Sequence, residues 1–353
     1  MAVRITKPAF NIREKLSELD KPAGIIGTQI LKTNTLTEFA RAAHTGRRNF
    51  LRNGAMEVWQ RGTSFTNIFN YTADRWQATR NGGNVNQIVK SENNSWIGDD
   101  YGFNWFLKYG FNGTGGAGAA FINQPLESAD SKKLRGKPVC FSFYAKTSSH
   151  HAGKRFRSCI GFHTETGAQN DGMYYSGFKT ASSTTKLRGY FYPNELWSRY
   201  WVTANMPDNV EQIGVSLIDA DYDNGDIDIT GCQLEIGNAP TPFEHLPYGV
   251  EEELCKRYYE VILLKGIASS GYSAGSGGYD NHLLSVAYSV EKRTTPTFTY
   301  DAVTNYQPGG GSGTPSNLFS HTKVLNIKTG STNSTWQPQV INSNSYAYVT
   351  AEL

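Results

Sequence analysis

Four large aromatic residues within fourteen positions are the most prominent candidates for binding chemistry: Trp96, Tyr101, Trp105 and Tyr109. Short polar residues are interleaved with them, namely Asn93, Asn94, Asp99, Asp100 and Asn104. Exposed rings stack on the C–H faces of sugars, while amides and carboxylates pair with the sugar hydroxyl groups. The segment therefore predicts glycan binding, although each ring taken singly is also compatible with a core position.

Two further sets of aromatic residues differ in their surroundings. A second candidate group for ring stacking consists of Tyr174, Tyr175, Tyr190 and Tyr192. A structural role is predicted for three tryptophans in apparent core strands, namely Trp59, Trp76 and Trp201.

The densest acidic cluster consists of Asp219, Asp221, Asp223, Asp226 and Asp228. Oxygen-rich clusters bind Ca²⁺, and an EF-hand loop has glycine at its sixth position and glutamate at its twelfth. Counted from Asp219, the glycine here is seventh and no glutamate is twelfth. No metal site or cofactor is therefore predicted, and Asp219, Asp221 and Asp223 remain only as calcium candidates. The alternative is a hairpin turn at Asn224-Gly225 flanked by solvent-facing aspartates.

Two other kinds of site find no matching pattern. Thiolate and imidazole hold zinc, but the spacing of the candidate ligands matches no known finger. These candidates are Cys140, His150, His151, Cys159 and His163.

A glycosidase needs two carboxylates close together, and the candidate acids are not distinguished from surface charge. They are Asp99, Asp100, Glu127, Glu165 and Glu195. With no recognisable Cys/His nucleophile context either, the sequence predicts a non-enzymatic protein without catalytic residues.

The composition and the hydrophobic pattern predict a mainly β protein. Aromatic residues make up 13% of the chain and charged residues 18%, with 36 glycines, which favours a loop-rich β fold. Val139, Phe141 and Phe143 alternate with more polar neighbours, as in a half-buried strand. Comparable runs lie at 158–164, 186–192, 198–206 and 212–218. Many short strands without intervening helices predict a β-sandwich.

The end of this sandwich has its own signature. Ile227 and Ile229 lie on one face of the last strand, and the apolar alternation changes phase after Gly231. A glycine at a phase change predicts a β-bulge. After Pro247 a short closing helix is expected, followed by its exit to residue 264, with Glu252/Lys256 and Glu253/Arg257 spaced as ion pairs.

These patterns divide the chain into three parts: an arm at 1–48, a sandwich at 49–260 and a small β domain at 261–353. Two short helices are predicted in the arm, at 12–19 and 35–43. Residues 1–52 carry ten Lys/Arg against four Asp/Glu, a charge of +6. Without a core of its own, the arm is expected to dock on another protein. No base-stacking motif accompanies its arginines, so no nucleic-acid partner is predicted.

Several segments resemble a known protein class. QLEIGNAPTPFEHLPYGVEEELCKRYYE at 233–260 resembles the closing segment of a carbohydrate-binding-module-like jelly roll of bacteriophage tail fibres. NFLRNGAMEVWQRGTSFTN at 49–67, followed by YTADRWQ at 71–77, resembles the opening segment of that domain. FNIREKLSELDKPAGI at 10–25 is similar to the leader of marine and cyanobacterial phage virion proteins. The last ~90 residues match only in general style.

The resemblance implies a virion structural protein of the tail-fibre type, held by its arm to a tail or capsid protein. It further implies a homotrimer, made in the host cytoplasm and displayed on the particle exterior for attachment to host surface glycan. The alternative is a capsid head fibre or decoration protein with a purely structural role. The sequence does not distinguish tail from capsid attachment.

Two remaining features fit that compartment. The four cysteines, at 140, 159, 232 and 255, are expected to be reduced and buried rather than paired in disulfides. No apolar run approaches the ~18 residues of a membrane helix, so no membrane insertion is predicted.

Overall fold

The computed structural model describes most of the chain after residue 46. The described residues are 47–66, 70–80, 85–93, 102–112, 120–167, 173–174, 177–178, 184–220, 224–271, 280–300, 305–306, 315–331 and 339–352. The chain divides into two compact units, residues 1–48 and residues 49–353. The helices predicted at 12–19 and 35–43 lie outside the described residues.

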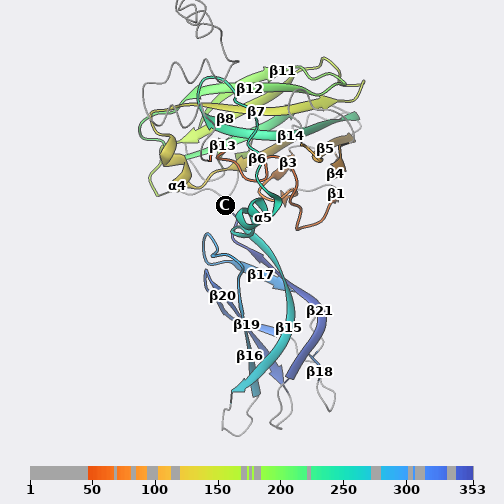
Figure 1. Cartoon of the computed structure of the whole chain (residues 1–353), viewed down its shortest axis with the longest axis vertical. Coiled ribbons are helices and arrows are strands. Elements are labelled where there is room, and N and C mark those ends of the chain that lie inside the picture. The colour runs from red at the N-terminus through yellow and green to blue at the C-terminus, as the bar shows by residue number, and fades with distance from the viewer. Residues whose placement is uncertain are drawn as a thin grey trace, which may run out of the picture. The chain divides into compact units, whose positions relative to one another are not determined.

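Two six-stranded antiparallel sheets form the first part of unit 49–353 (Figure 1). Sheet A contains, in spatial order, β1 (Ser64–Thr66), β4 (Val85–Glu92), β5 (Trp105–Asn112), β14 (Asn224–Ile236), β7 (Pro138–Thr147) and β12 (Ser198–Asn205). Sheet B contains β11 (Thr185–Phe191), β8 (Phe156–His163), β13 (Gln212–Ala220), β6 (Ala120–Pro125), β3 (Gln77–Arg80) and β2 (Asn70–Tyr71). Successive strands cross between the sheets, so the fold is the predicted jelly-roll β-sandwich.

Four short elements lie between these strands. Helix α4 (Ser128–Ser131) and the 3₁₀ turn η1 (Lys132–Leu134) connect β6 to β7. Strands β9 (Met173–Tyr174) and β10 (Gly177–Phe178) pair with each other as a separate two-stranded ribbon.

The core lies between the two sheets and is built by strand alternation. Phe141 and Phe143 of β7 are fully buried, and the ring of Phe143 lies 4.9 Å from that of Phe191 in sheet B. Trp59 and Trp76 are also buried, which confirms their predicted structural role. The indole Nε1 of Trp76 donates to the carbonyl oxygen of Asn53 at 2.9 Å, so this buried polar atom is satisfied.

Strand β14 contains the predicted bulge. Gly231 has φ +60°, and the register with β7 shifts between Thr230 and Gln233. The shift turns apolar residues on both sides of the bulge toward the core, where four of them are fully buried. These residues are Ile227, Ile229, Cys232 and Leu234. A continuous strand would have turned one of the two pairs, Ile227 and Ile229 or Cys232 and Leu234, to the opposite face of sheet A.

The start of β14 differs from the prediction. Asn224 and Gly225 already pair with Asn112 and Phe111 of β5, as the first residues of the strand. The predicted hairpin turn at this dipeptide is therefore wrong, because both residues belong to the strand and pair with β5.

The opening segment of the sandwich lies against this closing strand. The backbone N–H of Phe50 donates to the carbonyl oxygen of Leu234 at 2.9 Å, and that of Cys232 donates to Gly54 at 2.9 Å. The side chain of Asn49 bridges the same strand, accepting from the N–H of Leu234 and donating to Cys232 O, both at 3.0 Å. The two ends of the domain are thus joined directly.

Helix α5 (Tyr248–Lys256) follows the sandwich. The predicted ion pair between Glu252 and Lys256 is present at 3.3 Å, whereas Arg257 pairs with Glu127 of the sandwich at 2.9 Å. The predicted helix exit to residue 264 is wrong, because strand β15 (Tyr259–Gly271) begins directly after the helix. The run Tyr-Tyr-Glu-Val-Ile favours strand over helix through its aromatic and β-branched residues.

A separate seven-stranded sheet, which we call the C-terminal sheet, completes the described structure, in agreement with the predicted small C-terminal β domain. Its order is β17-β21-β15-β16-β20-β19, with β18 also paired to β21. The remaining bounds are β16 (Asp280–Ala287), β17 (Thr297–Tyr300), β18 (Asn305–Tyr306), β19 (Pro315–Ser320), β20 (Val324–Ser331) and β21 (Gln339–Thr350). Its small core contains Ile262, Tyr288, Leu325, Ala347 and Val349.

A buried arginine links the sandwich to the residues that follow β21. Arg75 is 1% exposed and forms an ion pair with Glu352. Its other guanidinium nitrogen donates to Pro125 O at 2.7 Å, and the guanidinium lies 3.8 Å from the ring centre of Tyr258. Arg61 also contacts Glu352, at 2.9 Å.

All four cysteines are buried, as expected, and burial raises the pKa of the Cys232 and Cys255 thiols. Within the described ranges, no helix has both the length and the apolar character needed to cross a membrane.

Candidate functional site

The predicted ring cluster at 96–109 is not a single exposed surface. Tyr109 is fully buried between Leu107 and Phe111 on the core-facing side of β5, so its prediction as a glycan-binding residue is wrong. Trp105 is half-buried at the start of that strand, with the ammonium of Lys90 4.2 Å from its ring centre. Trp96 and Tyr101 lie outside the described residues.

Trp201 is the exposed tryptophan that the sequence interpretation misplaced. It is 55% exposed on β12, the edge strand of sheet A. Tyr200 packs inward, with its ring 5.2 Å from that of Phe191, and strand alternation therefore turns Trp201 outward. The predicted structural role of Trp201 is wrong. The inward sequence Tyr200, Val202 and Ala204 was the signal that could have identified it.

Polar side chains share the outward face of β12 with Trp201. Thr203 and Asn205 are exposed and follow it at two-residue intervals, while Arg199 precedes it. Arg199 is fixed in place, because its Nη2 donates to Ser142 Oγ at 3.0 Å and to Thr241 O at 2.6 Å. The outward face of β12, formed by Arg199, Trp201, Thr203 and Asn205, is called the Trp201 face below.

A charged cluster lies further along the same side of sheet A. Lys108 Nζ contacts Asp226 at 2.9 Å and Asp228 at 3.5 Å, and Lys146 Nζ contacts Asp228 at 3.6 Å. The ammonium of Lys146 also lies 5.1 Å from the ring centre of Trp197. The cluster therefore couples two cations, two carboxylates and an indole across three neighbouring strands and the start of β12.

Burial perturbs the acid–base properties of this cluster. Desolvation raises the pKa of Asp228 to about 6, against the opposing charges of Lys108 and Lys146. Burial alone lowers the pKa of Lys108, but its hydrogen bond to Asp226 and the charge of Asp228 leave that pKa raised. A carboxylate with such a shift suits proton transfer, but the nearest charged groups are lysines. The arrangement is that of an ion-pair network.

Aromatic residues cover much of this side of sheet A. Phe103, Phe106, Tyr144, Trp197 and Phe243 form a separate buried cluster there. Trp197 is only 9% exposed, and its indole N–H has no hydrogen-bond partner among the described residues. Trp197 is therefore a buried structural residue on this side of sheet A, whereas the ring of Trp201 is exposed to solvent.

The structure adds little evidence for the calcium candidates, and it describes only part of the second aromatic group. Asp221 and Asp223 lie outside the described residues, and no side-chain position is described for Asp219. Among the residues that the structure describes, no three His, Cys, Asp or Glu side chains are grouped to hold a metal ion. In the second aromatic group, Tyr190 and Tyr192 are 55% and 53% exposed. The side chains of Tyr174 and Tyr175 are not described.

Comparison with known proteins returns structural likenesses only. No family model and no curated protein matches the chain. The enzymatically active domain of tailspike protein 4 of bacteriophage CBA120 is 14% identical over 54% of this chain, with a TM-score of 0.36. This chain spans only 21% of that protein.

Two carbohydrate-binding modules show a similar likeness. The C-terminal family 22 module of Clostridium thermocellum Xyn10B is 15% identical, covers 52% of this chain and 99% of its own, and has a TM-score of 0.32. TmCBM61, solved with β-1,4-galactotriose, is 12% identical over 54% of this chain and 100% of its own, with a TM-score of 0.30. At these identities and TM-scores, the likeness assigns neither ligand nor reaction to this chain.

Proposed function

We propose that this chain is a virion structural protein whose sandwich binds host-surface glycan without cleaving it. The observation that carries the binding part is Trp201, a 55% exposed indole on an edge strand, flanked on its own face by Thr203 and Asn205. An indole of this kind gives up little side-chain entropy on stacking against a sugar, and the flanking hydroxyl and amide match the hydroxyl groups of the ligand.

The virion part of the proposal rests on sequence. The segments at 10–25, 49–67 and 233–260 carry the resemblance to phage virion proteins. In this proposal residues 1–48 attach the protein to a tail or capsid protein, and the sandwich is displayed on the particle exterior, as a homotrimer. The tail-fibre role is preferred to the decoration role because the indole of Trp201 and its polar neighbours Thr203 and Asn205 supply the two kinds of contact that sugar binding needs.

Replacing Trp201 by alanine is expected to weaken binding to host envelope polysaccharide by about tenfold, since the stacking surface is lost. A neutral sugar bound at one site has a dissociation constant near 1 mM, about −4 kcal/mol, so the measurement needs a multivalent polymer or a high protein concentration. The melting temperature should stay nearly unchanged, because exposed positions contribute within about 0.5 kcal/mol. Binding is measured by calorimetry and stability by thermal unfolding.

The matched control is Tyr248→Ala, which removes a ring of similar exposure, 53%, from helix α5. Equal losses in both variants would show that the polymer adheres to aromatic surface without a site. If the purified protein does not bind host polysaccharide, the decoration role becomes the preferred proposal. Release of reducing ends would make the protein an enzyme instead.

Deleting residues 1–48 is expected to leave a folded protein that no longer joins particles. The deletion ends at the boundary between the two compact units, before Asn49 contacts β14. A longer deletion, through Met56, serves as the contrast, because it also removes the backbone pairing of Phe50 and Gly54 with β14. It should lower the melting temperature. Normal copy number in particles that carry the shorter deletion would place the anchor elsewhere in the chain.

A further inference from the structure

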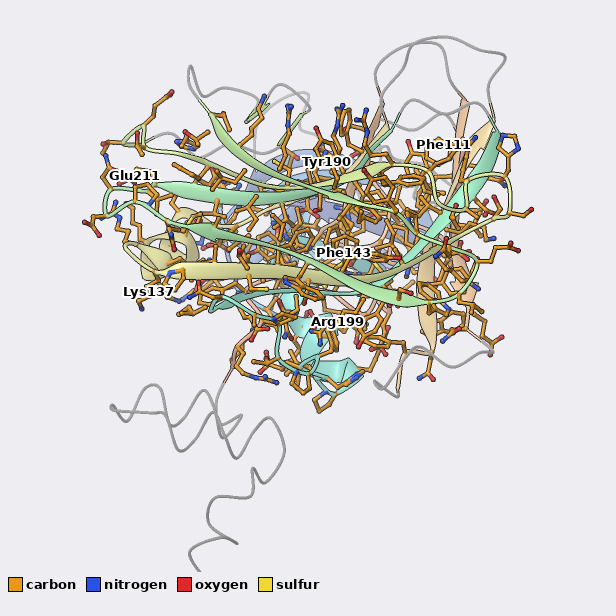
Figure 2. All side chains as sticks on the ribbon, turned by 90° about the horizontal axis from the view of Figure 1, so that it is seen from above. Phe111, Lys137, Phe143, Tyr190, Arg199 and Glu211 are labelled. Atoms are coloured by element: carbon orange, nitrogen blue, oxygen red, sulfur yellow. The ribbon has the colours of Figure 1, made fainter. Side chains whose placement is uncertain are left out.

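A second exposed ring lies on the other side of the sandwich from the Trp201 face. Tyr190 is 55% exposed near the end of β11, the edge strand of sheet B. Its neighbour Phe191 is 3% exposed and faces the core, so alternation turns Tyr190 outward. Figure 2 shows Tyr190 and Arg199 on opposite sides of the sandwich, with Phe143 between them.

Two guanidinium groups frame this ring. The guanidinium carbon of Arg155 lies 5.1 Å from the ring centre of Tyr190, and that of Arg157 lies 5.8 Å away. Arg157 of β8 is also the register partner of Tyr190. Within ~6 Å an arginine is attracted to the ring face, so the ring itself orients both cations.

Further cations share the outward side of β11. Arg188 and Lys186 precede Tyr190 at two-residue intervals, and Arg188 is exposed. The surface formed by Arg155, Arg157, Lys186, Arg188 and Tyr190 is called the Tyr190 face below.

The chemistry of the Tyr190 face differs from that of the Trp201 face. A guanidinium binds a carboxylate through two parallel N–H donors, which gives the pair both strength and a fixed geometry. The ring beside it offers a flat surface to the C–H face of a sugar. A sugar that carries a carboxylate on its ring meets both requirements at once, whereas a neutral sugar uses only the tyrosine.

We propose that the Tyr190 face is a second glycan site, which takes a uronic-acid residue of an acidic polysaccharide. The proposal rests on the proposed function in that its ligand is a glycan, but it is independent of Trp201. Two sites on opposite sides would bind two separate segments of polymer, and a repetitive polymer then gains avidity over either site alone.

The test uses the full-length protein with alginate, a polymer of uronic acids, and with fully esterified alginate, whose carboxylates are masked. The wild type should bind alginate at least about tenfold more tightly. The double variant Arg155→Gln/Arg188→Gln should lose that preference and show a smaller salt dependence, because fewer ionic contacts are made. Tyr190→Ala should weaken alginate binding, and Tyr190→Phe should restore it.

The charge-matched control is Lys133→Gln/Lys323→Gln, which removes two positive charges from lysines whose side chains are both 65% exposed. It should retain the preference for alginate. If the wild type binds both polymers equally, or the arginine double variant behaves like the control, the acidic-sugar site is refuted. Failure of Trp201→Ala to affect host polysaccharide would refute the proposed stacking site without altering this comparison.

Discussion

Glu352→Ala is expected to lower the free energy of unfolding by about 3 to 5 kcal/mol, the usual cost of removing one partner of a buried ion pair. Arg75 is 1% exposed and forms that pair with Glu352 from within the sandwich. Burial by itself lowers the pKa of Arg75, but the charge of Glu352 outweighs it and leaves the pKa raised. Without the carboxylate, the guanidinium stays buried as an uncompensated charge.

The loss is measured by urea unfolding of the full-length protein. Glu253→Ala is the control, because this exposed glutamate lies on α5 and should change stability by no more than about 0.5 kcal/mol. A third variant, Arg75→Met in the Glu352→Ala background, removes the stranded charge and should recover part of the loss. A cost below about 1 kcal/mol for Glu352→Ala would mean that Arg75 is compensated by its contacts with Pro125 and Tyr258 alone.

Gly231→Ala is expected to cost about 2 to 5 kcal/mol, the second largest effect. Gly231 has φ +60°, a conformation that costs an L-residue about 1 to 2 kcal/mol. A Cβ would also lie 2.7 Å from Cζ of Phe103 and 2.8 Å from Cδ2 of Tyr144, and overpacking adds about 1 to 3 kcal/mol. The bulge would therefore be disfavoured by both strain and contact.

Gly249→Ala is the matched control, because a Cβ at this position of α5 meets no atom within 4 Å. It should be neutral or slightly stabilising, as expected for alanine in a helix. Combining Gly231→Ala with Phe103→Leu, and comparing it with Phe103→Leu alone, measures the part of the cost that comes from the contact with Phe103, because the strain and the contact with Tyr144 remain. Thermal unfolding is sufficient as the measurement. Stability of Gly231→Ala equal to that of the control would contradict the bulge geometry.

Most of the sandwich could be predicted from the sequence because its strands alternate clearly. The runs at 139–146, 158–164, 186–192, 198–206 and 212–218 correspond to β7, β8, β11, β12 and β13. The bulge at Gly231 was also predictable, since a phase change and a glycine coincide there. Residues 1–46 lie outside this comparison.

The exposed rings were placed with less success. The alternation of Tyr200, Val202 and Ala204 indicated the outward side of Trp201, but the degree to which a ring is exposed depends on strand order as well. Tyr109 alternates with Leu107 and Phe111, and β5 lies inside sheet A, so its ring is buried. Trp201 has a neighbouring strand on one side only, because β12 ends the sheet. Strand order is set by pairing between residues far apart in the chain, which no local pattern contains. The ion pairs of Asp228 and Arg75 have the same long-range origin.

The bond between Asn49 and Leu234 also determines when the sandwich can fold during synthesis. The two residues are 185 positions apart, which a ribosome needs about 10 to 40 s to translate. Throughout that interval the opening segment lacks its pairing partner, and sheet A lacks the strand that joins β5 to β7. The closing strand β14 therefore leaves the ribosome while the sandwich is still incomplete. The sandwich can be completed only after residue 236 has emerged.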